Sequence, residues 1–207
     1  MRRVLVLSIV VALLAAGCLA RTYTPAVRYE LPARIQVDQH AATGYTVAVR
    51  PLDIARPYGA KMVYRIRGHV LVPYEDAEWS ELPRESITRA LSDALRSTGS
   101  FADVADAVAV TQPDIIVSGE VRRFYQDRTQ SPWRAHCEIR VEARMGIERR
   151  NLWVDTIVEE AVQEADSMAA FAPAMGEALG AAVSRAANGI ALAAADEATR
   201  ETTKQTQ

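Results

Sequence analysis

The sequence is poor in the residue types that catalysis and nucleic-acid binding most often need. Its 207 residues include only two cysteines and three histidines, so neither a disulfide framework nor a cluster of Cys and His metal ligands is expected. It has no glycine-rich phosphate loop and no block of basic residues that could follow a phosphate backbone. These absences argue against a nucleotide hydrolase and a nucleic-acid-binding protein, and they predict no metal and no cofactor.

The N-terminal end resembles a bacterial lipoprotein signal. Arg2 and Arg3 precede an uncharged run of 13 residues from Val4 to Ala16, which is shorter than the roughly 20 residues that a membrane-spanning helix needs. The run ends in the lipobox-like segment Leu14-Ala15-Ala16-Gly17-Cys18. The resemblance implies cleavage between Gly17 and Cys18 and attachment of acyl chains, such as palmitate, to Cys18, and two or more chains make a stable anchor. The alternative is an ordinary secretory peptide with a chance cysteine.

Leu19 bears on which membrane would hold the anchor. In lipoproteins of Gram-negative bacteria an aspartate after the acylated cysteine commonly retains the protein at the inner membrane, and leucine resembles the outer-membrane default. We therefore expect a lipid-anchored protein on the periplasmic face of the outer membrane.

Cleavage would divide the chain into four parts. Residues 1–17 form the signal peptide, 18–28 the acylated anchor and linker, 29–195 a single domain, and 196–207 a polar tail that we expect to be disordered. The linker from Leu19 to Arg28 could extend at most roughly 33 to 36 Å. The mature chain would have 190 residues with 22 basic and 26 acidic side chains, a net charge of −4.

Apolar periods of two and 3.6 residues alternate along the domain. They predict strands at 45–50, 62–66, 114–125 and 152–162, a strand from Val70 that stops at Pro73, a short extended stretch from Val104, and a strand at 136–145 with one wholly apolar face. An amphipathic helix is expected from Ser80 to Thr98, with Pro83 in its first turn and Gly99 just after its end.

A second, long helix is marked by apolar residues from Met168 to Ala194. Pro173 either kinks this helix or marks its beginning near Ala172, and the small residues Gly176, Gly180 and Ala182 would let it approach a sheet or a neighbouring subunit closely. The elements together predict an α/β (α+β) sandwich, a mixed and mostly antiparallel sheet with two main helices covering one face.

Residues with catalytic potential are scattered. His136 and Cys137 are adjacent on a strand and therefore point to opposite faces, which predicts a buried thiol and an imidazole that faces water. His40 and His69 have no ligand spacing around them. The carboxylates alternate with arginines, which predicts cross-strand ion pairs on a solvated face or, alternatively, a docking surface. We expect no catalytic residues and no enzyme; a periplasmic hydrolase would need a nucleophile, a base and an oxyanion site.

Aromatic residues beside turns and prolines are the best candidates for a partner interface. Tyr74, Trp79 and Trp133 are such residues, and the segment from Tyr74 to Pro83 is the predicted contact with a partner or a sister subunit. The alternative for Trp79 is a local core at the helix entry.

Short landmarks behind the lipobox resemble the ABC-type transport auxiliary lipoprotein family, the type encoded in paraquat-inducible operons. In chain order they are Tyr29-Glu30-Leu31, Val49-x-Pro51, Tyr64-Arg65, Tyr74 with Trp79-Ser80-Glu81-Leu82-Pro83, Ser97-x-Gly99-x-Phe101-x-x-Val104, and Gly119-Glu120-Val121-x-x-Phe124. Two features depart from the family pattern: Ser80 stands where an alanine is common, and the stretch from Pro51 to Ala60 is less regular in its prolines.

The resemblance implies a non-catalytic auxiliary subunit at the outer membrane. It would work with a mammalian-cell-entry-domain protein and, indirectly, with an ABC permease and ATPase that move phospholipid or other hydrophobic molecules between membranes. Some members of the family form rings, so a homo-oligomeric ring is also implied. The alternative function is an assembly factor or another lipoprotein associated with an outer-membrane β-barrel.

Overall fold

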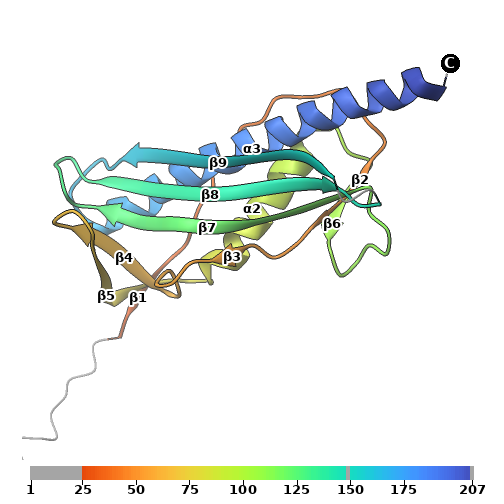
Figure 1. Cartoon of the computed structure of the whole chain (residues 1–207). Helices are drawn as coiled ribbons and strands as arrows, with labels where there is room; N and C mark the ends of the chain where they lie inside the picture. Colours follow the sequence, from red (N-terminus) through yellow and green to blue (C-terminus); the bar gives the residue numbers. More distant parts are fainter. Residues whose placement is uncertain (1–24, 148–149, 206–207) are drawn as a thin grey trace, which may run out of the picture.

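The computed structural model describes residues 25–147 and 150–205, in which one nine-stranded mixed sheet is covered on one face by two helices (Figure 1). Three long strands pair antiparallel to one another: β7 (Ile115–Asp127), β8 (Arg134–Met145) and β9 (Asn151–Val162). The other edge of β7 pairs in parallel, successively, with β2 (Thr46–Val49), β3 (Asp53–Ile54) and β4 (Lys61–Ile66). Beyond these lie β6 (Asp103–Asp106) beside β2, then β5 (Val70–Trp79) beside β4, and β1 (Val27–Tyr29) beside β5. This arrangement confirms the predicted fold class.

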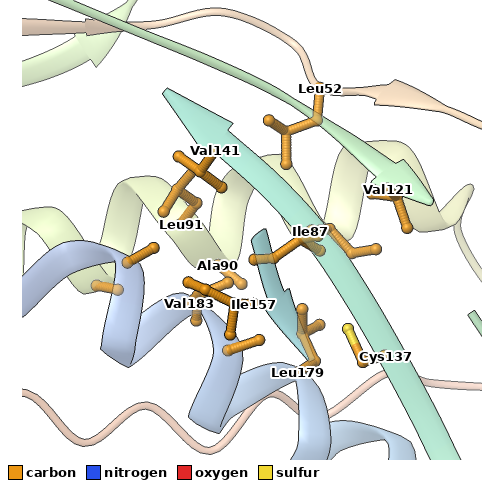
Figure 2. Packing of buried hydrophobic residues seen from close by; sticks show 14 of the residues in the cluster. Leu52, Ile87, Ala90, Leu91, Val121, Cys137, Val141, Ile157, Leu179 and Val183 are labelled. Carbon is orange, nitrogen blue, oxygen red and sulfur yellow. The ribbon is translucent and has the colours of Figure 1, made fainter. Parts of the chain in front are cut away.

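The core lies between the sheet and the helices α2 (Pro83–Ser97) and α3 (Met168–Gln205). Figure 2 shows side chains of both helices meeting those of the sheet, with the Cys137 sulfur among them. The apolar face predicted for β8 is wholly buried, because every second side chain points at the helices. Helix α3 is long and apolar enough to cross a membrane, but most of its apolar stretch is buried inside the fold, as in a core helix.

Helix α2 follows the predicted signals closely. Pro83 is its first residue, where a missing N–H breaks no hydrogen bond. Thr98 caps the end, and Gly99 follows with φ of +68°, the left-handed conformation that glycine adopts at low cost. The helix begins three residues later than predicted, because Trp79 is still part of β5.

Two predicted ends are wrong. Strand β5 does not stop at Pro73 but continues to Trp79; β1 reaches only Ala77 to Trp79, so Pro73 lies where β5 is an edge strand, and edge strands tolerate proline. The polar tail predicted from residue 196 is instead helical through Gln205. There the buried carboxylate of Glu197 pairs with Arg150 and Arg200.

Helix α3 begins at Met168, so Pro173 lies within its second turn and does not mark its N-terminus. The side chain of Pro173 is exposed. The Tyr45 hydroxyl donates to Glu201 at 2.7 Å and fastens the other end of the helix to the segment that precedes β2. β1 begins at Val27, inside the predicted linker.

An extended strap, residues 30–43, runs along α3 and was not predicted. Its alternate residues Leu31, Ala33, Ile35 and Val37 are half-buried against the core. The strap contacts α3 at every fourth residue: Gly176, Gly180, Ser184 and Asn188. The backbone comes so close that a Cβ at Gly180 would lie 2.1 Å from the Arg34 carbonyl oxygen. Gly176 and Gly180 therefore allow the close approach of the strap, whereas Gly189 lies against the Trp153 ring of β9.

Candidate functional site

Within the segment from Tyr74 to Pro83 predicted for a partner interface, the structure buries Trp79 and Pro83 and leaves Tyr74 partly exposed. Trp79 is 4% exposed and packs between Phe124 and Phe171, with ring centroids 5.5 and 5.8 Å away. Pro83 is also buried. Their side chains belong to the core at the helix entry, which was the alternative for Trp79. Tyr74 is partly exposed, and the predicted acylation and cleavage site at Gly17 and Cys18 lies outside the described residues.

Tyr74 belongs to a cluster around the Arg128 guanidinium, which we call the Arg128 cluster. It comprises Arg128 and the rings of Tyr64, Tyr74 and Trp133, whose centroids lie 4.3, 5.0 and 4.0 Å from the guanidinium carbon. Cations over aromatic faces are attracted by the ring quadrupole. β4, β5 and the connection between β7 and β8 supply these residues, so Tyr74 and Trp133 meet although they are far apart in sequence.

Two glutamines, Gln126 and Gln163, hold the Arg128 cluster in place through hydrogen bonds. Arg128 donates through Nε to Gln126 Oε1 at 2.7 Å and through Nη2 to the Tyr74 hydroxyl, which in turn donates to Gln126. Gln126 is fully buried and donates to Gln163 at 3.0 Å. Burial raises the pKa of Tyr74 to about 12, so the phenol keeps the proton that it donates. Arg128 is therefore held rigidly at one end of the sheet.

A second cluster lies on the face of the sheet away from the helices and corrects the prediction for His136. The imidazole does not face water: it is 6% exposed and stacks on Tyr125 at 4.8 Å with an interplanar angle of 7°. Arg65 covers the Tyr125 ring at 4.8 Å and pairs with Asp127, while His136 Nδ1 lies 2.9 Å from Glu160 Oε1. The aromatic side chain on the neighbouring strand supplies the cover that alternation alone does not reveal.

The thiol and the imidazole that are adjacent in sequence are kept apart in the structure. Burial raises the pKa of Cys137 to about 12 and keeps it a thiol, and the sheet separates it from the imidazole of His136. Within residues 25–147 and 150–205 there is no group of three or more His, Cys, Asp or Glu side chains placed to hold a metal ion.

The rest of the open face is charged, with an apolar margin. Ion pairs join Arg123 to Glu138 at 3.2 Å and Glu142 to Arg140 and Arg144 at 3.1 and 3.0 Å. At the margin, β9 exposes a row of valines, each nearly half exposed: Val154, Val158 and Val162. The predicted ion pairs are present, both across and along the strands.

The fold and these clusters define an α+β protein whose surface offers aromatic, ionic and apolar contacts. The chain belongs to the ABC-type transport auxiliary lipoprotein component family, whose model matches residues 29–187. No curated protein matches the sequence.

Solved structures share the fold at low sequence identity. Protein XCC0632 of the DUF330 family from Xanthomonas campestris superimposes with a TM-score of 0.75 at 20% identity, over 84% of this chain and 99% of its own. An uncharacterized protein gives a TM-score of 0.58 at 12% identity over 86% and 99%, and protein CT253 from Chlamydia trachomatis gives 0.50 at 8% over 71% and 98%. At these identities the likeness concerns the fold alone.

Proposed function

We propose that this chain is an outer-membrane lipoprotein, anchored through acylated Cys18 on the periplasmic face, that serves as a non-catalytic subunit of an ABC transport system. The observation that carries the proposal is the combination of a lipobox at residues 14–18 with a family match over residues 29–187. The system would include a mammalian-cell-entry-domain protein, an ABC permease and an ATPase, and would move phospholipid or another hydrophobic substrate. A homo-oligomeric ring is part of the proposal.

The surface supports a role in binding. The described residues hold no metal cluster, and the thiol of Cys137 is buried. Tyr74 is held in a rigid cluster at one end of the sheet, and the valine row of β9 flanks a charged face. Rigid aromatic and apolar groups beside charges are typical of protein interfaces.

The decisive experiment is in-cell photo-crosslinking of the tagged, acylated protein followed by mass spectrometry. The crosslinker is placed in turn at Tyr74, at Val158 on the open face, and at Leu192, which is 57% exposed on α3. We expect crosslinks to a mammalian-cell-entry protein from one of these faces, and recovery of the ABC permease with it. Recovery of a β-barrel protein alone would favour the assembly-factor alternative instead.

The anchor is tested separately. Changing Leu19→Asp should move the protein from outer-membrane to inner-membrane fractions, whereas Leu19→Ala should not. A Cys18→Ser variant should leave the membrane fraction altogether, because it removes the acyl chains. An unchanged distribution of both Leu19→Asp and Cys18→Ser would contradict the proposed anchoring.

A further inference from the structure

The turn between β4 and β5 has an unusual apex. Arg67, Gly68 and His69 form the turn, and Arg67 has φ of +46° followed by +77° at Gly68. A left-handed conformation is unfavourable for arginine and natural for glycine or asparagine. The tight hairpin turn needs positive φ here, yet an arginine occupies a position that glycine or asparagine would fill at lower cost, and such outliers often mark a functional contact.

The apex carries charge and apolar surface together. Arg67 and His69 are exposed, and Val70 beside them is 50% exposed. Arg67 makes no ion pair within the described part of the chain. The neighbouring Arg128 is also without a carboxylate within 4.0 Å in that part of the chain, because its partners are the rings of its cluster. An arginine next to exposed apolar and aromatic groups suits the interface of an anionic bilayer.

The chain between the anchor and β1 allows this turn to reach the membrane. Nine peptide units separate Cys18 from Val27 and span at most roughly 30 to 32 Å. Val27 pairs with Ala77, and the seven residues of β5 from Ala77 back to Val70 cover about 23 Å. The turn therefore lies within the reach of the lipid anchor.

Charges along β5 favour contact through the turn over contact through the side of the strand. The exposed carboxylates of Glu75 and Asp76 lie next to the segment that pairs with β1, where an anionic bilayer would repel them. Glu164 and Asp166 make the β9–α3 connection acidic as well. The turn thus offers an exposed arginine away from these carboxylates, at the end of the sheet where β4 ends and β5 begins (Figure 1).

We propose that the β4–β5 turn, residues 67–70, docks on the surface of the bilayer that holds the acyl chains, with Arg67 on anionic headgroups and Val70 at the interface. This inference rests on the acylation in the proposed function. Docking by the turn would fix the orientation of the sheet relative to the membrane, which an acyl anchor on a linker alone does not.

The test uses full-length acylated protein in vesicles of phosphatidylethanolamine and phosphatidylglycerol. An environment-sensitive fluorophore is attached at His69→Cys or, as the matched control, at Val108→Cys, which is 95% exposed between β6 and β7. Acylation occupies Cys18 and burial protects Cys137, so only the introduced thiol reacts. Brominated acyl chains then report contact with lipid.

We expect several-fold stronger quenching at position 69 than at position 108, and a return to the control value with Arg67→Glu or Val70→Asp. Arg67→Lys should retain the contact. Equal quenching at positions 69 and 108 would overturn docking. Strong quenching at position 69 that persists in both Arg67→Glu and Val70→Asp would overturn it as well, because the tether alone would then bring the turn close to the lipid. A blue shift without quenching would place a protein, rather than lipid, on the turn. Co-flotation of the protein with the vesicles measures anchoring by the acyl chains independently. Loss of the anchor can therefore be distinguished from loss of docking by the turn.

Discussion

Replacing Gly180 with alanine gives the sharpest test of the strap, because the structure reverses the usual sign of the effect. In the interior of a solvent-exposed helix, Gly→Ala stabilises by about 1 kcal/mol. In α3, however, the new Cβ would lie 2.1 to 2.8 Å from backbone atoms of Arg34. A backbone cannot rotate away as a flexible side chain does, so the strap must move.

Movement of the strap gives up contacts on both sides of Gly180. The hydrogen bonds from Arg34 N to the Gly176 carbonyl, at 3.3 Å, and from Gln36 N to Ser184 Oγ, at 2.9 Å, contribute about 1 kcal/mol each. Partial exposure of Leu31 and Ile35 adds about 1 kcal/mol in total. After the gain in helix propensity, we expect Gly180→Ala to lower the free energy of unfolding by about 2 kcal/mol.

Urea unfolding followed by far-ultraviolet circular dichroism measures this change. Ala181→Gly is the matched control, because Ala181 is exposed on the same turn of α3 and reports helix propensity alone. It should cost about 1 kcal/mol. An increase in stability for Gly180→Ala would refute the contact between the strap and the helix.

Three further outcomes follow from buried or paired groups. Glu197→Gln should destabilise the protein by about 1 to 2 kcal/mol in the same assay, because it leaves Arg150 and Arg200 without their common carboxylate. Hydrogen bonds from Arg89 and Ser86 lower the pKa of Glu81 to about 2 from 4.5, so this contribution to stability is complete above pH 4.5 and disappears as the pH falls toward 2; a Glu81→Gln variant should lack that part of the acid dependence in pH-resolved unfolding. Maleimide should fail to modify Cys137 in the native protein and should modify it in denaturant, as mass spectrometry would show, because the thiol is buried and its pKa is raised to about 12.

The sequence correctly predicts those elements in which the period of apolar residues matches the face that is buried in the fold. The strand at 136–145 alternates without interruption because one of its faces packs against the helices and the other is the open, charged face of the sheet. Helix α2 is equally clear, since Pro83 and Gly99 specify its two ends. The strap is missed because half-buried alternation without strand pairing resembles a loop, and the small residues of α3 alone do not say what approaches them.

The Arg128 cluster illustrates what a linear pattern does not contain. Tyr74 and Trp133 are recognisable as candidate interface aromatics from their neighbours in sequence. Their common partner Arg128 is not, because the three residues come from β5 and the β7–β8 connection, which meet only after the sheet has formed. His136 shows the same limit, since its burial depends on Tyr125 and Arg65.

A single extra residue in β7 explains why the landmark Gly119-Glu120-Val121-x-x-Phe124 has its spacing. Val121 pairs with Ile139 and Arg123 with Glu138, so Arg122 is a bulge that opposes no residue of its own. Strict alternation would send Phe124 to the open face, but the bulge turns it, and Gln126 after it, toward the helices. Gln126 can then reach Gln163 and hold Arg128. The spacing of the landmark therefore sets the bulge that directs Gln126 toward Arg128. The landmark itself contributes to the surface indirectly, by positioning the Arg128 cluster.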